Sequence, residues 1–250
     1  MEPIEGPAAI VLAAGKGTRM KSGLAKVLFP FAGRPIVHRV LDAVEEAGFA
    51  RTVVVVGYQH ERVREELAGR GAVFALQEPQ LGTGHAVQCA APLLDGFAGD
   101  VVVLAGDVPL IRARTLRALM DRHASAKAAV TILTAVLPDA AGYGRIVRDA
   151  AGRVTAIVEH GDATPEQRGI REFNSSIYAF RWPFLAGALP RLRTENEQAE
   201  LYLTDTVRMA VDDGLRVEGM IVEDIHELAG INTREQLAEA ERLLEERGDA

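Results

Sequence analysis

Cysteine is almost absent from this chain of 250 residues, in which Cys89 stands alone. A single cysteine excludes an intramolecular disulfide and fits a reducing compartment. No apolar run reaches the ~18 residues that a membrane-spanning helix needs. The first residues, which include Glu2, Pro3 and Glu5, do not resemble a secretory signal. We therefore expect a cytoplasmic protein with no membrane partner.

Positive charge is also scarce. The chain carries 28 lysines and arginines against 35 aspartates and glutamates, which gives a formal net charge of −7. This balance argues against a nucleic-acid-binding module, which needs a basic surface, so we expect no nucleic-acid partner. Hydrophobic residues make up 48% of the chain, enough for a substantial core in one large domain.

Short apolar runs alternate with helical patterns over the first half of the chain. We expect strands at 8–12, 52–56, 73–77, 101–105 and 129–136, and helices at 36–47, 61–68, 83–94 and 113–124. Such alternation predicts an α/β, Rossmann-like fold, in which helices cover both faces of a mostly parallel sheet. Ligands of these folds bind beyond the carboxyl ends of the strands.

The pattern changes after about residue 138. Strand-like segments at 145–148, 154–159 and 176–180 lie among polar loops and predict a smaller antiparallel lobe that covers the sheet edge. A helix at 203–212, a strand at 216–222 and a last helix after Asn232 return the chain to the core. We therefore expect a single domain over 1–250, with a first part at about 8–138, the lobe at about 139–200 and the return at 201–250.

The first predicted strand runs directly into a glycine loop, Gly15-Lys16-Gly17, which is followed by the cations Arg19 and Lys26. Glycines let a backbone approach an anion, and cations beside such a loop neutralise phosphate charge. The two common phosphate-loop motifs both require glycine at position 20, where this chain has methionine. The loop therefore predicts a polyphosphate site of another type, or else a plain glycine turn between the first strand and the first helix.

Other polar residues each have a structural alternative to a binding role. Thr83, in a second glycine loop, either helps to recognise the edge of a nucleotide base by hydrogen bonds or caps the following helix. Asp107 follows a buried strand and is either a ligand-binding carboxylate or a turn residue before a proline. Asn232 opens the last helix, where asparagine is a favoured N-cap. Glu159 and Asn174 either contact a ligand or are solvated polar residues.

Longer motifs occur along nearly the whole chain. They are LAAGKGTRM at 12–20, QLGTGHA at 80–86, GDVPL at 106–110, GYGRI at 142–146, IVEHGDAT at 157–164, EFNSS at 172–176, YLTD at 202–205 and GINTREQL at 230–237. Together they resemble the uridylyltransferase domain of the bifunctional N-acetylglucosamine-1-phosphate uridylyltransferase family, within the sugar-1-phosphate nucleotidyltransferases.

The resemblance implies an enzyme that transfers a uridylyl group from UTP to N-acetylglucosamine 1-phosphate, with Mg²⁺ as cofactor. The products are UDP-N-acetylglucosamine, a cell-wall precursor, and pyrophosphate. The implied residues are Arg19 and Lys26 for catalysis; Leu12, Ala14, Gly15, Gly17, Gln77, Gly82 and Thr83 for the nucleotide; Gly144, Glu159 and Asn174 for the sugar, in the lobe at 139–200; and Asp107 and Asn232 for Mg²⁺.

The chain departs from the family pattern at several positions. The family commonly has glycine at positions 176 and 199, tyrosine at 105 and 201, and lysine at 161, where this chain has Ser176, Ala199, Ala105, Leu201 and Gly161. Three of these residues, Ser176, Ala199 and Leu201, are near the expected sugar side. They leave open a related transferase that uses another sugar phosphate or nucleoside triphosphate, and a non-catalytic sensor of nucleotide sugars. The acetyltransferase half of the family is absent, so we expect no acetyltransferase activity.

Overall fold

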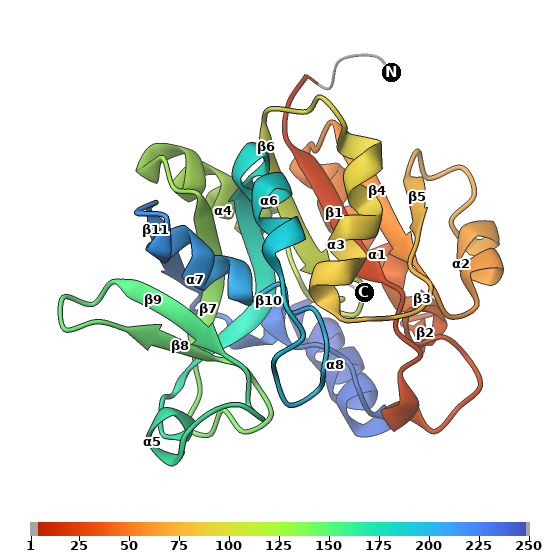
Figure 1. Ribbon diagram of the computed structural model, residues 1–250. Helices are drawn as coiled ribbons and strands as arrows, with labels where there is room; N and C mark the ends of the chain where they lie inside the picture. The colour runs from red at the N-terminus through yellow and green to blue at the C-terminus, as the bar shows by residue number, and fades with distance from the viewer. Residues whose placement is uncertain (1–4, 249–250) are drawn as a thin grey trace.

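The centre of the computed structural model, which describes residues 5–248, is a mixed β-sheet (Figure 1). Its strands are β1 (Ala8–Ala13), β4 (Arg51–Val56), β5 (Val73–Leu76), β6 (Asp100–Ala105), β7 (Val130–Val136), β10 (Glu172–Arg181) and β11 (Val217–Ile221). They lie in the order β11-β7-β10-β6-β1-β4-β5. β1 pairs in parallel with β4 and β6, β4 with β5, and β7 with β11. The predicted α/β fold with a mostly parallel sheet is confirmed.

The central strands are continuous apolar runs rich in valine. Residues 53–56 of β4 and 101–104 of β6 have no solvent exposure. Strands that are buried on both faces need such runs, and β-branched side chains fit the pleated surface well. In the parallel register Leu12 of β1 lies opposite Ala105 of β6, and the N–H of Gly106 donates to the Leu12 carbonyl at 2.8 Å. The loops that follow β1 and β6 therefore leave the sheet side by side.

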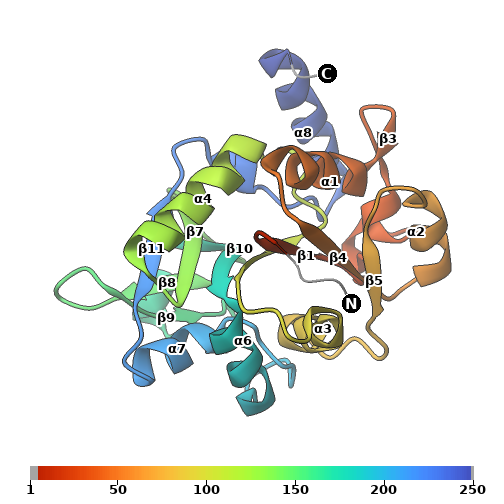
Figure 2. The same cartoon turned by 90° about the horizontal axis from the view of Figure 1, so that it is seen from above.

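Helices cover both faces of the sheet (Figure 2). α1 (Ile36–Ala47), α2 (His60–Glu66) and α4 (Ala113–Ala126) lie on one face, and α3 (Thr83–Ala90), α6 (Trp182–Ala188) and α7 (Asp205–Asp212) lie on the other. Side chains of successive β1 residues point to opposite faces of the sheet. Ala9 and Val11 belong to one core cluster, and Ala8 and Ile10 belong to the other.

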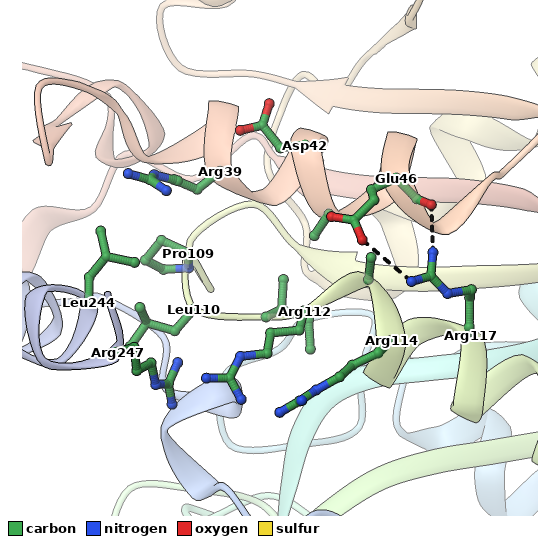
Figure 3. A pocket seen from close by; sticks show the side chains of 13 residues that line it. Arg39, Asp42, Glu46, Pro109, Leu110, Arg112, Arg114, Arg117, Leu244 and Arg247 are labelled. Carbon is green, nitrogen blue, oxygen red and sulfur yellow. Dashed lines mark hydrogen bonds and ion pairs between the residues drawn. The ribbon is translucent and has the colours of Figure 1, made fainter. Parts of the chain in front are cut away.

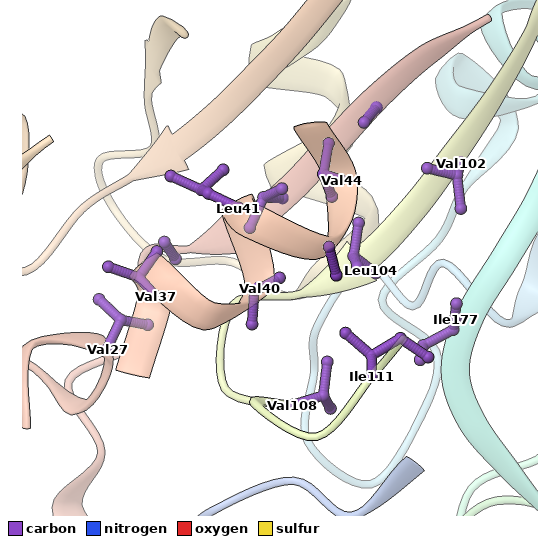
Figure 4. Close-up of a cluster of buried hydrophobic side chains, with 14 of the residues drawn as sticks. Val27, Val37, Val40, Leu41, Val44, Val102, Leu104, Val108, Ile111 and Ile177 are labelled. Carbon is purple, nitrogen blue, oxygen red and sulfur yellow. The ribbon is translucent and has the colours of Figure 1, made fainter. Parts of the chain in front are cut away.

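α1 occupies the range that its periodicity predicts. Val40, Leu41 and Val44 face the sheet and pack in one cluster with Leu104 of β6 (Figure 4). Gly48, with a φ of 87°, ends the helix, because glycine takes the left-handed conformation without a Cβ penalty.

β10 is longer than predicted and has a different place in the fold. We expected a strand at 176–180 in a lobe at the sheet edge, but β10 begins at Glu172 and lies between β6 and β7, antiparallel to both. The small antiparallel part is the hairpin of β8 (Arg145–Arg148) and β9 (Val154–Val158), which pairs with β10 through β8. The register of β10 with β7 shifts between Asn174 and Tyr178, which marks a bulge.

The last helix, α8 (Arg234–Arg247), packs against the N-terminal part of the chain. Met20, Phe31, Leu110, Ile231 and Leu244 belong to this third hydrophobic cluster. The remaining elements are short: η1 (Thr18–Met20), η2 (Lys26–Leu28), β2 (Pro30–Phe31), β3 (Arg34–Pro35), η3 (Ala91–Leu94), α5 (Pro165–Arg168), η4 (Leu189–Arg191) and η5 (Ile225–Leu228). The helix predicted at 83–94 is therefore α3 followed by the 3₁₀ turn η3. Within residues 5–248, no helix has the length and apolar character to cross a bilayer.

Candidate active site

Two cationic side chains, one carboxylate and one amide from distant parts of the chain meet beyond the ends of β1 and β6. Lys26 Nζ forms an ion pair with the Asp107 carboxylate and donates to Asn232 Oδ1 at 2.9 Å. Arg19 donates to the same Asn232 oxygen at 2.8 Å. Asp107 is buried, with 7% of its surface exposed. These four side chains therefore share one small volume, where they can act on one anionic ligand.

The folding of the glycine loop places Lys26 in this cluster. Gly17 has a φ of 68°, and a Cβ on Gly17 would lie 2.6 Å from the Cβ of Lys26. Glycine at position 17 thus lets the loop pass directly against the Lys26 side chain. The loop continues into η1 and η2, and the first α-helix begins only at Ile36. The glycine loop is therefore not a short turn that leads directly from the first strand into the first α-helix.

Hydrophobic neighbours fix both members of the Lys26–Asp107 pair. Val27 and Val108, the next residues in the chain, are each 2% exposed and lie in the core cluster beneath α1 (Figure 4). Burial of these neighbours leaves the charged side chains of Lys26 and Asp107 at the core boundary, where they are 18% and 9% exposed.

Asn232 reaches the cluster because its segment is hydrogen-bonded to the loop after β6. The N–H of Ile231 donates to the Asp107 carbonyl at 2.9 Å. The N-cap of α8 is Thr233, which forms a capping box with Gln236, so the alternative of Asn232 as the cap is wrong. The Asn232 side-chain oxygen instead accepts hydrogen bonds from both Lys26 and Arg19.

A cavity of about 480 Å³ opens over this cluster. Among its lining residues are most of those predicted for the site: Leu12, Gly15, Arg19, Lys26, Thr83, Asp107, Asn174 and Asn232. Ala14, Gly17, Gln77, Gly82, Gly144 and Glu159 are not among the residues that line it.

The residues predicted to bind uracil form a tightly bonded loop at one side of the cavity. The buried Gln77 amide donates to the Gly82 carbonyl at 2.8 Å and lies 3.3 Å from His85 Nδ1. A Cβ on Gly82 would meet the Leu201 carbonyl at 2.7 Å, so only glycine fits there. Gly82 is also the N-cap of α3, whereas the Thr83 hydroxyl accepts the N–H of Leu203 at 3.0 Å. The alternative of Thr83 as a helix cap is therefore wrong.

The three residues predicted to bind the sugar lie together. The N–H of Asn174 donates to the Gly144 carbonyl at 2.9 Å, and a Cβ on Gly144 would lie 3.2 Å from Glu159 Oε2. The Glu159 carboxylate accepts a hydrogen bond from the Thr204 hydroxyl at 3.1 Å. Burial raises the pKa of the Glu159 carboxyl above its usual value, and the neighbouring charges of Asp162 and Asp205 add to this effect.

The sequence reasoning assigned no binding role to several residues that line the cavity, among them Tyr143, Ser175, Ser176 and Gln236. The Tyr143 ring packs against the Phe173 ring with 4.5 Å between ring centroids and an angle of 48° between the ring planes. Burial raises the pKa of Tyr143, and the nearby Asp107 charge raises it further. Tyr143 and Ser176 lie inside the GYGRI and EFNSS motifs, so the signal was present, but the predicted roles went to their neighbours.

The oxygens of Asp107 and Asn232 suit a hard divalent cation. A Cβ on Gly230 would lie 3.4 Å from an Asp107 oxygen and 3.8 Å from the Asn232 amide nitrogen, so glycine keeps the space between them open. One carboxylate and one amide fit Mg²⁺, which binds few protein ligands and keeps water or phosphate oxygens in its other positions. In the described part of the chain, no group of three or more His, Cys, Asp or Glu side chains is placed to hold a metal ion.

A second hollow of about 630 Å³ lies between α1, α4 and the end of α8 and is rich in arginine (Figure 3). Its arginines are largely paired with carboxylates. Arg117 contacts Glu46, and Arg247 and Arg112 both contact Asp224. Because these carboxylates offset the positive charge, the hollow carries no argument for an anion site.

Comparison with known proteins agrees with the motifs and the fold. The family model of the MobA-like NTP transferase domain matches residues 9–173. The bifunctional protein GlmU of Pelobacter propionicus is 53% identical over 245 residues, which cover 98% of this chain and 53% of that protein. The bifunctional protein GlmU of Geobacter metallireducens is 54% identical over 241 residues, which cover 96% of this chain and 51% of that protein. The chain spans about half the length of the curated relatives it matches.

The family match covers more than half of the chain, from β1 to the start of β10, and includes the glycine loop, Lys26 and Asp107. The resemblance that the motifs indicate is thus confirmed, and the chain is a nucleotidyltransferase that belongs to the MobA-like NTP transferase family.

Proposed function

We propose that this chain transfers the uridylyl group of UTP to N-acetylglucosamine 1-phosphate and releases pyrophosphate. The convergence of Lys26, Arg19, Asp107 and Asn232 in one cavity carries this proposal. Family membership supports the transfer of a nucleotidyl group. The motif resemblance and the grouping of Gly144, Glu159 and Asn174 support an N-acetylated sugar as the acceptor.

The nucleophile in this reaction is a phosphate oxygen of the sugar phosphate. The second pKa of a phosphate monoester is about 6, so the group is largely dianionic at neutral pH and no general base is needed. The oxygen attacks the α-phosphorus of UTP and forms a new P–O bond. The bond from the α-phosphorus to the bridging oxygen breaks, and its electron pair leaves with pyrophosphate.

The main obstacle is the repulsion between a dianion and a polyanion. Lys26 and Arg19 offset it with fixed positive charge, which stabilises the charge that develops on the leaving pyrophosphate. Asp107 and Asn232 would hold Mg²⁺, which supplies additional charge neutralisation as a Lewis acid when it is bound. The cavity walls hold the two substrates in line, which lowers the entropic part of the barrier.

Binding of the two substrates divides between the two sides of the cavity. We assign uracil to the loop that contains Gln77, Gly82 and Thr83, in which the Gln77 amide fixes the loop through the Gly82 carbonyl. The backbone and side chains beside β8 and the β10 bulge, with Asn174 on the cavity wall, would receive the sugar.

A panel of nucleoside triphosphates and sugar 1-phosphates, scored by pyrophosphate release with and without Mg²⁺, tests the proposal. We expect the highest kcat/KM for UTP with N-acetylglucosamine 1-phosphate, and loss of turnover when EDTA removes the metal. A clear preference for another pair would identify a related transferase instead. Binding of UTP without any turnover in Mg²⁺ would identify a sensor and refute the enzymatic proposal.

A further inference from the structure

We propose that Ser176 determines specificity in this cavity and that its hydroxyl group hydrogen-bonds the sugar phosphate. The inference rests on the proposed function, because it concerns the acceptor side of the same site. Ser176 lines the cavity together with Asn174 and is exposed, while both its neighbours in β10 are buried.

The backbone conformation at this position disfavours serine. Ser176 has a φ of 63°, in the left-handed region that side chains with a Cβ adopt at a cost and that glycine adopts freely. The conformation belongs to the bulge where the register of β10 with β7 shifts. Residues in such conformations cluster at active sites and ligand clamps.

The hydrogen bonds around the bulge leave the hydroxyl available to a ligand. Asn174 donates to the Tyr178 hydroxyl at 2.8 Å and accepts the N–H of Ser176 at 3.1 Å, so both ends of its amide are engaged. The Ser176 side chain also hydrogen-bonds the Tyr178 hydroxyl. A serine hydroxyl has one donor and two acceptor positions, so this single contact leaves capacity for a ligand group in the cavity.

The location of Ser176 points to the acceptor substrate. It lies two residues from Asn174, whose N–H donates to the Gly144 carbonyl, on the side of the cavity that β10 and the loop before β8 form. The loop of Gln77 and Gly82 comes from the other side, where α3 begins. The chemical group that Ser176 reads is therefore a hydroxyl, amide or phosphate oxygen of a sugar phosphate, and not the base.

The chain offers a matched control for backbone strain. Ala32, in the turn between β2 and β3, also has a positive φ, of 47°, and is exposed, but it is not among the residues that line the cavity. Ala32→Gly therefore relieves left-handed strain without changing a polar group in the site. Ser176→Gly relieves strain and removes the hydroxyl, whereas Ser176→Ala removes the hydroxyl and keeps the strain.

Steady-state kinetics on these variants test the inference. Loss of one neutral hydrogen bond corresponds to roughly a 2- to 12-fold change. We expect both Ser176 variants to raise the KM for the sugar phosphate within this range, with the KM for UTP unchanged. Ala32→Gly should leave both KM values as in the parent. Ser176→Gly should also raise the melting temperature, which keeps the test usable if the strained Ser176→Ala variant folds poorly.

The possible failures can be told apart. An active parent whose KM for the sugar phosphate is unchanged by Ser176→Gly and Ser176→Ala overturns the role of Ser176 alone. If the Ser176 variants change the KM for UTP and not the KM for the sugar phosphate, the proposed role of Ser176 is also overturned, because Ser176 then contacts the nucleotide. A parent that releases no pyrophosphate from any substrate pair refutes the proposed function and this inference with it.

Discussion

Substitution of Gly17 is a sharp test of the proposed cation cluster. Alanine at position 17 would keep the charge and polarity of the loop, so any effect comes from shape. Its Cβ would lie 2.6 Å from the Cβ of Lys26 and 3.2 Å from its Cγ. The contact involves the root of the side chain, which rotation of χ angles cannot remove. Lys26 or the loop must therefore move.

The expected loss in the Gly17→Ala variant has two causes, the displacement of Lys26 and left-handed backbone strain. Ordinary van der Waals contact between carbons begins at about 3.5 Å, so the two Cβ atoms must separate by about 1 Å. A displacement of about 1 Å at a catalytic group can cost ~10²-fold in rate. The φ of 68° adds about 1–2 kcal/mol of left-handed strain to the unfavourable side of folding. We therefore expect Gly17→Ala to lose both activity and stability.

Substitutions at two other glycines distinguish the effect of displacement from the effect of backbone strain. Gly33 has a φ of 84° and open space where the methyl group of an alanine would lie, and Gly23 has neither a positive φ nor a close neighbour. Gly33→Ala should lose stability only, and Gly23→Ala should resemble the parent. Pyrophosphate release measures kcat/KM, and urea unfolding measures stability. A Gly17→Ala variant with kcat/KM within about threefold of the parent would refute the reasoning that this glycine positions Lys26.

Three further predictions address charge, burial and protonation. Lys26→Ala should lower kcat by ~10²–10³-fold with a retained circular dichroism spectrum, because it removes a charge that acts on the transition state; a near-parent kcat would contradict this role. Leu104→Ala, at a fully buried position in β6, should lower the free energy of unfolding by about 2–5 kcal/mol in urea titrations, and a loss below about 1 kcal/mol would mean that the core adapts. The pKa of the Glu159 carboxyl is raised in the fold, so the folded state binds this proton more tightly than the unfolded chain does. The Glu159 carboxyl therefore lowers the free energy of unfolding as pH rises from about 4.5 through the raised pKa. Glu159→Gln should therefore gain stability over the parent above this range and show no such gain below it, as measured by urea unfolding at several pH values; a gain that does not vary with pH would disprove the assignment.

The first half of the fold was predictable because its elements are decided locally. The valine runs of β4 and β6 need no partner to be recognised as buried strands, and α1 carries both its apolar stripe and its stop at Gly48. The position of β10 was not predictable in the same way. Its place between β6 and β7 depends on pairing partners that are distant in the sequence, and its bulge hides the alternation of the strand.

The candidate site shows the same division. Residue types and spacing marked Lys26 and Asp107, since a glycine loop and a strand end are local features. Asn232 looked like a helix cap from its neighbours alone, and only the capping box of Thr233 with Gln236 removes that interpretation. Tyr143 and Ser176 lie inside recognised motifs, but tertiary packing decides which residues of a motif line the cavity, and a single sequence does not show this.

The bond between the N–H of Ile231 and the Asp107 carbonyl has a consequence for how the protein becomes functional. Lys26 and Asn232 are separated by 206 positions, so a chain growing on a ribosome holds the glycine loop long before it holds the last partner of that loop. The proposed cation cluster is therefore complete only after the C-terminal segment docks against the loop that follows β6. Displacement of this segment would separate Asn232 from Lys26 and Arg19 and would leave the glycine loop in place.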